Sequence, residues 1–153
     1  MPLTLEQRSV ILKEAYTWIG TPYAGWSCMK GKRGGVDCGQ LVYGVFRNAG
    51  RLPVLTLPRD YSLQVSQHQA STEYVDLVET YFRSISESEV LPGDVVVFQF
   101  GLAYAHAAII ISWPEHIINA FGAPHGVCSA HGKKTPKFKH APKKFFTLRD
   151  EWC

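Results

Sequence analysis

The chain has 153 residues, enough for one domain with its own hydrophobic core, and 46% of them are hydrophobic, as is typical of globular proteins. Its 16 basic and 13 acidic side chains leave a formal net charge of only +3, which does not indicate nucleic acid as a partner. No apolar run reaches the roughly 18 residues of a membrane span, and the first residues lack the layout of a signal peptide. We therefore expect a single domain over residues 1–153 that is synthesised in the cytoplasm and has no membrane span.

The first predicted element is a helix over residues 4–19. Its apolar side chains recur on one face, Thr4 and Gln7 can form a capping box, and Gly20 ends the run. A loop is expected over residues 23–36 because glycine and lysine dominate its middle.

A second helix is predicted over residues 38–49, where the apolar side chains again form a stripe and Gly50 is the expected stop. Cys38 is its first residue. Unpaired N–H groups and the helix dipole at such a position lower the pKa of a thiol, which favours a reactive cysteine, while the alternative is a buried core thiol. No Cys-x-x-Cys pair occurs, so we expect reduced thiols at all four cysteines, Cys28, Cys38, Cys128 and Cys153.

Strands dominate the second half of the chain. Residues 51–70 are expected to be irregular, and a shorter helix is predicted over residues 72–82. Apolar and β-branched runs separated by turns then predict strands over residues 94–100, 106–112 and 117–121, with weaker candidates over 126–130 and 145–149. Because helices precede a run of strands, the pattern predicts an α+β fold with an antiparallel sheet.

A nucleophilic cysteine needs a base, and His106 has the most favourable setting because it opens the most apolar predicted strand. The alternative for His106 is a satisfied core histidine. If the turn over residues 113–116 joins antiparallel strands, His106 lies opposite Phe121, and Asn119 is its diagonal neighbour on the same face. The Asn119 amide oxygen could then hold the imidazole N–H, whereas a one-residue change of register would turn Asn119 to the other face. The competing histidines are His68, His116, His125, His131 and His140.

Six short motifs occur in a fixed order between residues 20 and 120: Gly20-Thr21-Pro22-Tyr23, Asp37-Cys38, Leu57-Pro58-Arg59, Leu91-Pro92-Gly93-Asp94-Val95, His106-Ala107-Ala108-Ile109-Ile110-Ile111 and Ile117-Ile118-Asn119-Ala120. In this order they resemble the motifs of the NlpC/P60 cysteine peptidases. The resemblance implies a papain-like fold in which N-terminal helices pack on a central antiparallel sheet of about five or six strands. In that fold the cysteine begins a helix, and the sheet carries the histidine and a third polar residue.

The same resemblance implies a chemistry. Members of the family hydrolyse bacterial cell-wall peptides, commonly between D-γ-glutamyl and diaminopimelate, so the expected substrate is a peptidoglycan stem peptide or a related γ-glutamyl peptide. Matched by position, Cys38 is the nucleophile, His106 is the base and acid, and Asn119 is the third member. Tyr23 matches a tyrosine that assists the oxyanion, and Asp37 matches an acidic residue that binds a free amine. No metal and no cofactor is implied.

One position departs from the family pattern, because Gly39 follows the cysteine where the family usually has serine. The long stretch over residues 60–90 and the missing signal peptide and wall-binding repeats resemble the phage or prophage tail-associated branch. That branch implies phage tail proteins as partners, and the virion, the periplasm or the cell wall as the destination. Two alternatives stay open, a tail-assembly component whose papain-like domain is structural, and a Cys-His amidase or acyltransferase on another acyl donor.

Two further groups of residues have an ordinary and a functional interpretation. His125, Cys128 and His131 could bind zinc, but a structural zinc site usually has a closed set of four ligands. The lysines around Phe138 are interpreted as a solvated basic segment, with attraction to anionic wall polymers or an acidic partner as the alternative. These lysines are Lys133, Lys134, Lys137, Lys139, Lys143 and Lys144.

Overall fold

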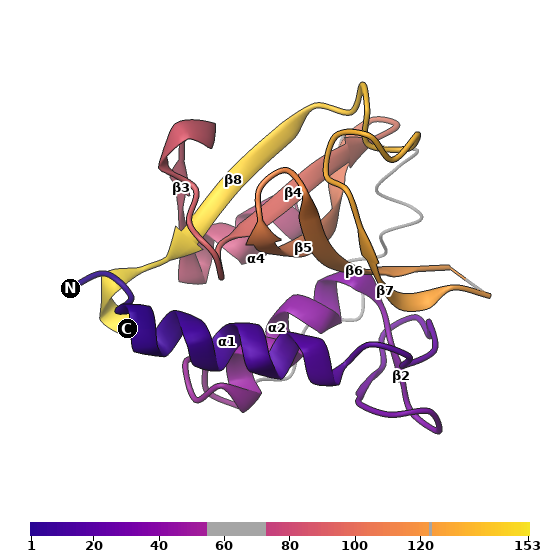
Figure 1. The fold of residues 1–153 in the computed structure, drawn as a ribbon, viewed down its shortest axis with the longest axis horizontal. Helices are drawn as coiled ribbons and strands as arrows, with labels where there is room; N and C mark the ends of the chain where they lie inside the picture. Colours follow the sequence, from indigo (N-terminus) through magenta and orange to yellow (C-terminus); the bar gives the residue numbers. More distant parts are fainter. Residues whose placement is uncertain (55–72, 123) are drawn as a thin grey trace.

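The computed structural model describes residues 1–54, 73–122 and 124–153 (Figure 1). The predicted motif Leu57-Pro58-Arg59, His68 and most of the predicted irregular stretch lie outside these ranges. The helices described are α1 (Leu5–Thr17), α2 (Cys38–Asn48) and α4 (Glu73–Tyr81), with 3-10 turns at Glu87–Glu89 and Asp150–Trp152. The strands are β1 (Cys28–Met29), β2 (Gly35–Val36), β3 (Phe82–Ile85), β4 (Val95–Phe100), β5 (Ala103–Ser112), β6 (His116–Phe121), β7 (Gly126–Ala130) and β8 (Lys143–Leu148). Within the described ranges, no helix has both the length and the apolar character needed to cross a membrane.

Both N-terminal helices begin with a capping side chain, as was predicted for the first of them. The Thr4 side chain accepts the backbone N–H of Gln7, and the Gln7 side chain accepts the backbone N–H of Thr4, which completes the capping box of α1. α1 ends at Thr17, two residues before its predicted end. α2 is capped by Asp37, whose Oδ1 accepts the backbone N–H of Gln40 at 2.8 Å. Both helices lie along the same side of the sheet (Figure 1).

Six strands form one antiparallel sheet with the order β3-β8-β4-β5-β6-β7, which confirms the predicted α+β fold. Besides shifts of one or two residues at element ends, three details differ from the sequence-based expectation. β5 begins at Ala103, before the predicted start at His106. β3 was not predicted, because it follows α4 without any turn residue between them. The short β1–β2 hairpin lies inside the predicted loop over residues 23–36.

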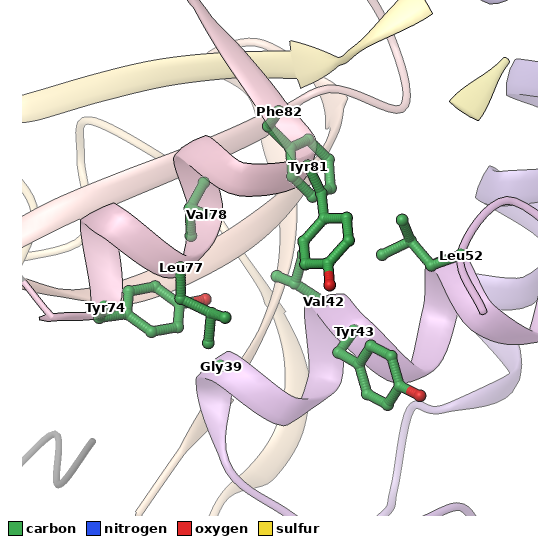
Figure 2. Close-up of a pocket in the computed structure, with 9 residues that line it drawn as sticks. All are labelled: Gly39, Val42, Tyr43, Leu52, Tyr74, Leu77, Val78, Tyr81 and Phe82. Carbon is green, nitrogen blue, oxygen red and sulfur yellow. The ribbon is translucent and has the colours of Figure 1, made fainter. Parts of the chain in front are cut away.

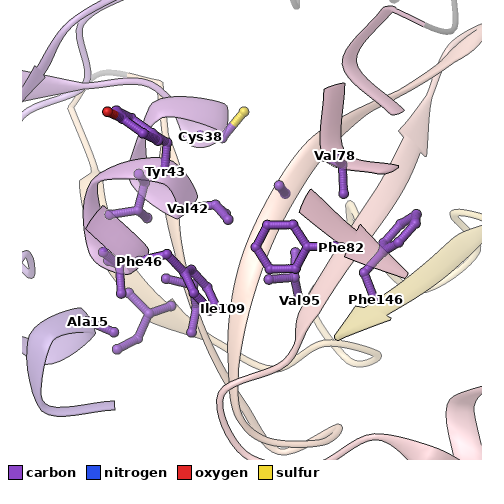
Figure 3. Packing of buried hydrophobic residues seen from close by; sticks show 14 of the residues in the cluster. Ala15, Cys38, Val42, Tyr43, Phe46, Val78, Phe82, Val95, Ile109 and Phe146 are labelled. Carbon is purple, nitrogen blue, oxygen red and sulfur yellow. The ribbon is translucent and has the colours of Figure 1, made fainter. Parts of the chain in front are cut away.

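Apolar side chains cover both faces of the sheet. The first cluster lies under the helices, where Val42 and Phe46 of α2 pack with Val95 and Ile109 of the sheet (Figure 3). The second cluster lies on the opposite face, as strand alternation requires. Its buried members are Val96, Phe98, Ala108, Ile110, Ile117, Phe138 and Phe145. Burial on both faces explains why continuous apolar runs, rather than alternating ones, predicted the central strands.

A buried ion pair joins α1 to the start of β4. Arg8 Nη1 lies 2.9 Å from Asp94 Oδ1, and the two side chains are only 7% and 1% exposed. Arg8 also donates to the carbonyl of Pro92, while Asp94 accepts from the Thr147 hydroxyl and from the backbone N–H of Leu91. The network therefore ties α1, the turn before β4 and β8 together through one carboxylate.

Candidate active site

Cys38 lies at the start of α2 with its thiol against β5, where Sγ is 3.5 Å from the carbonyl oxygen of Ala105 (Figure 3). The side chain is 3% exposed. Burial, and after it the charge of Asp37, raise the pKa of the thiol to about 12, although nearby backbone N–H groups, including that of Gly39, oppose the shift. Desolvation therefore outweighs the helix N-terminus, and the expectation of a lowered pKa was wrong.

The raised pKa predicts that Cys38 reacts slowly with alkylating agents in the free protein. We expect its rate with iodoacetamide to rise about tenfold per pH unit between roughly pH 7 and 10, because only the thiolate reacts and its fraction grows in that proportion below the pKa. Mass spectrometry of the modified peptide measures this rate, with the urea-unfolded chain as reference. A rate independent of pH between about 5 and 8 would instead indicate a preformed thiolate–imidazolium pair.

The structure joins His106 and Asn119 directly. β5 and β6 pair with Ala108 opposite Asn119, so Asn119 is the diagonal neighbour of His106. His106 Nε2 lies 2.9 Å from Asn119 Oδ1, and Asn119 Nδ2 donates to the carbonyl of Cys128 at 3.1 Å. The second bond fixes which way the amide faces, so Nε2 of the ring carries the proton and Nδ1 is the basic nitrogen.

Aromatic side chains of the second cluster enclose the imidazole of His106. The rings of Phe100 and Phe121 stack on it at centroid distances of 5.1 and 5.5 Å, and Phe138 lies at 5.5 Å. Burial lowers the pKa of His106 to about 4, although the hydrogen bond to Asn119 acts in the opposite direction. The ring is therefore neutral at pH 7, which is the state that a general base requires.

The Cys38 thiol contacts β5, the strand that carries His106, but the thiol and the imidazole belong to different apolar clusters. Cys38 belongs to the cluster under the helices, whereas the ring neighbours of His106 belong to the second cluster. No hydrogen bond joins Cys38 to His106 in the part of the chain that the structure describes, and the thiol donates to Ala105, the residue before His106. The Cys38 thiol and the His106 ring therefore lie on different faces of β5 in the structure.

Tyr23 and Asp37 are both close to the start of α2. Tyr23 forms a parallel bridge with Val36, and burial, followed by the charges of Cys38 and Asp37, raises the pKa of its hydroxyl well above the ordinary range. Asp37 is buried, and its two carboxylate oxygens accept the backbone N–H groups of Gln40 and Trp26. The Tyr23 hydroxyl is therefore a protonated donor near the thiol, and Asp37 holds the preceding loop against the helix.

The sequence model of the NlpC/P60 family matches residues 13–141, a stretch that includes all five predicted site residues. The chain belongs to the NlpC/P60 family. A comparison with curated proteins found no match.

Solved structures of NlpC/P60 proteins share the fold at low sequence identity. A Staphylococcus aureus protein described as similar to a lipoprotein is 21% identical with a TM-score of 0.65, and the match covers 98% of this chain and 44% of that chain. The NlpC/P60 domain of the peptidoglycan hydrolase SagA is 20% identical with a TM-score of 0.58, and the match covers 92% of this chain and 97% of that domain. The peptidoglycan hydrolase RipB from Mycobacterium tuberculosis is 18% identical with a TM-score of 0.57, and the match covers 93% of this chain and 64% of that chain. The chain therefore spans less than half of the first of these proteins.

The aromatic enclosure of this NlpC/P60 chain was not predicted from the sequence. Phe138 lies among lysines that were interpreted as a solvated segment, yet it is fully buried and stacks on Phe98 at 4.1 Å. The signal that could have found it is a single phenylalanine within a lysine-rich stretch, which indicates an anchored rather than a free segment. The structure thus assigns this segment a place beside His106.

A narrow apolar pocket begins next to the cysteine of this NlpC/P60 chain (Figure 2). It lies between α2 and α4, and its lining includes Gly39, Val42, Leu77 and Val78. Its volume of about 40 Å³ accommodates only a few water-sized groups.

The histidine and cysteine residues considered for zinc have other contacts. His131 Nδ1 accepts the backbone N–H groups of Lys133 and Lys134, and His125 lies on an aromatic ring edge of Phe121. Within the described ranges, no three histidine, cysteine, aspartate or glutamate side chains converge as a metal site would require.

Proposed function

We propose that the chain is a cysteine peptidase that hydrolyses amide bonds in bacterial cell-wall peptides, with the bond between D-γ-glutamyl and diaminopimelate as its target. The observation that carries this proposal is the hydrogen bond between His106 and Asn119, because it orients a neutral imidazole on the strand that Cys38 contacts. Family membership supports the chemistry, and two of the structures that share the fold are described as peptidoglycan hydrolases.

The proposed reaction requires the Cys38 sulfur and Nδ1 of His106 to come within hydrogen-bond distance, so one of the two side chains must leave the face of β5 on which it lies in the structure. The imidazole takes the thiol proton while sulfur bonds to the scissile carbonyl carbon, and the carbonyl electron pair moves to oxygen. When the tetrahedral intermediate collapses, the C–N bond breaks and the imidazolium gives its proton to the leaving amine. Water, deprotonated by His106, then attacks the thioester, which releases the acid and restores Cys38. Asn119 keeps the ring oriented in every step.

The developing oxyanion needs hydrogen-bond donors near the sulfur. The backbone N–H of Cys38 and the protonated hydroxyl of Tyr23 are proposed for this role, each contributing about 3–4 kcal/mol as in other acyl-transfer enzymes. Asp37 contributes by shaping the helix start and the loop that holds Trp26. The amine-binding role that the resemblance implies for Asp37 stays a prediction.

Digestion of purified peptidoglycan tests the proposal. We expect fragments with a free γ-carboxyl on D-glutamate and a free amine on diaminopimelate, identified by mass spectrometry against a buffer control. Walls that carry lysine in place of diaminopimelate serve as the second substrate and define the bond specificity. Walls of both types left intact by the wild-type protein would contradict a peptidase function.

A second candidate function is a tail-assembly component whose papain-like domain is structural. The observation that favours it is that no hydrogen bond joins Cys38 and His106 in the described residues. The same digestion separates the two functions, because a structural component releases no fragments. Association with phage tail proteins, and delivery to the virion, the periplasm or the cell wall, stay predictions from the sequence.

A further inference from the structure

Helix α1 carries an apolar stripe that is separate from the side of the helix that packs on the core. The core side is buried in the cluster under the helices. Because successive residues of a helix are rotated by about 100°, Leu5, Ser9, Leu12 and Tyr16 fall within an arc of about 60° on another side. Leu5 is 87% exposed and Tyr16 is 46% exposed. The stripe is therefore open to solvent.

An apolar groove runs beside this stripe, between α1 and the turn before β4. Its volume is about 260 Å³, and its lining consists of Leu5, Arg8, Ser9, Leu12, Leu91 and Pro92. Ten large apolar side chains are exposed among the described residues, and six of them lie on α1, on its flanks or on this turn: Met1, Leu5, Val10, Tyr16, Ile19 and Leu91. Such a concentration of exposed apolar side chains is typical of an interaction surface.

Two opposite charges lie on one flank of the stripe. Glu6 and Lys13 are seven residues apart, so they project from the same side of α1, and both are exposed. Neither of them forms an ion pair within the residues that the structure describes. One end of this flank is therefore negative and the other end is positive, which is the pattern of a surface that can pair with a copy of itself.

The stripe is also symmetric about its own centre. If a second α1 runs antiparallel with stripe against stripe, Leu5 lies opposite the partner's Tyr16, and Ser9 lies opposite the partner's Leu12. Both pairs are centred between residues 10 and 11, so one twofold axis relates them. The same axis brings each Glu6 within about 3 Å, measured along the helix, of the partner's Lys13. The apolar pairs and the charge pairs thus agree on one register.

We propose that this surface binds a second copy of the chain, in a twofold dimer with the two α1 helices packed antiparallel. The short side chain of Ser9 lets the helices approach, and the groove beside Leu5 and Ser9 receives the partner's Tyr16 and Leu12. Each copy contributes one helix of 13 residues and one turn, which is a small interface. The dissociation constant is accordingly expected at about 10–100 μM. The proposal does not depend on the chemistry of Cys38.

Sedimentation equilibrium of the full chain between about 1 and 500 μM tests the dimer. We expect the wild-type protein to pass from monomer to dimer over this range. Leu5→Glu should weaken the dimer at least about tenfold, because it places a charge in the apolar contact. The fold should persist, because Leu5 is exposed and a carboxylate suits the first turn of a helix. Leu102→Glu is the matched control, since Leu102 is 58% exposed on another surface.

Charge reversal tests the antiparallel register. Glu6→Lys and Lys13→Glu should each weaken the dimer about fivefold to twentyfold, because each turns two attractive pairs into two repulsive ones. A 1:1 mixture of these two proteins should associate as tightly as the wild-type protein, because every pair across the twofold axis is then of opposite charge. An effect on the stability of the monomer would not be reversed by mixing.

Three results would overturn the proposal. The first is a wild-type protein that stays monomeric up to 500 μM, which would leave the stripe to a different protein. The second is equal association of the Leu5→Glu and Leu102→Glu proteins, which would place the dimer contact elsewhere. The third is a mixture of the two charge-reversed proteins that associates no better than either protein alone, which would exclude the antiparallel register.

Discussion

Replacement of Cys38 by alanine is expected to lower the rate of cell-wall peptide hydrolysis by at least about a thousandfold, as loss of the nucleophile does in other acyl-transfer enzymes. The sulfur atom forms the acyl bond in the proposed reaction, and no other thiol is placed on β5 among the residues described. The fold should persist, because the substitution removes one sulfur atom and leaves the backbone of α2 and β5 unchanged, and the thiol's bond to Ala105 is weak. Circular dichroism and the thermal midpoint check the fold, and release of diaminopimelate amines measures activity.

Cys153→Ser is the matched control for this variant. The Cys153 thiol bonds the backbone carbonyls of Leu148 and Arg149 near the C-terminus and has no part in the proposed site. We expect it to retain wild-type hydrolysis. A Cys38→Ala protein that still digests peptidoglycan would rule out the thioester mechanism, regardless of the activity of the Cys153→Ser protein.

Replacement of Asp94 by asparagine is expected to reduce the free energy of unfolding by about 3–5 kcal/mol, because it leaves the buried guanidinium of Arg8 without a counter-charge. Asparagine has nearly the shape of aspartate, so packing is preserved while the charge is lost. For a chain of this size such a loss lowers the thermal midpoint by about 6–20 °C. Urea unfolding followed by tryptophan fluorescence measures the change directly.

Lys133→Met provides the comparison for an exposed ion pair. Lys133 Nζ lies 2.8 Å from Glu87, but the two side chains are 50% and 47% exposed, so water screens the pair. Removal of this pair should reduce the free energy of unfolding by less than about 1 kcal/mol. Equal reductions in the free energy of unfolding of the Asp94→Asn and Lys133→Met proteins would contradict this prediction. They would mean that burial of the Arg8–Asp94 pair does not determine how much the pair stabilises the fold.

Local signals in the sequence were sufficient for the helix that carries Cys38 and for placing His106 and Asn119 on the same face of neighbouring strands. Asp37 is a good N-cap, and the apolar stripe that follows has the helical period. A four-residue turn over 113–116 would pair Ser112 with Ile117 and Ile110 with Asn119. The structure instead pairs Ser112 with His116, and a register shift between Ile110 and Ser112 brings Ala108 opposite Asn119, which makes Asn119 the diagonal neighbour of His106. Both features depend on residues close together in the chain.

Features that depend on distant contacts could not be predicted in the same way. The pKa of Cys38 is set by how much water the sheet excludes, and nothing near the cysteine in sequence reports that burial. Phe138 becomes buried only when its segment packs on Phe98 and Phe100. β3 lacks a turn residue before it and is half polar, so periodicity gives it no signal.

The position of β8 has a consequence for the order of events during synthesis. β8 is the last of these strands in chain order, yet it lies between β3 and β4 and forms the hydrogen bonds that join them to one sheet. Cys38, His106 and Asn119 are therefore all translated before the strand that completes their scaffold. β3 can join the rest of the sheet only after β8 has been translated, so the sheet is completed later than the segments that carry the proposed site.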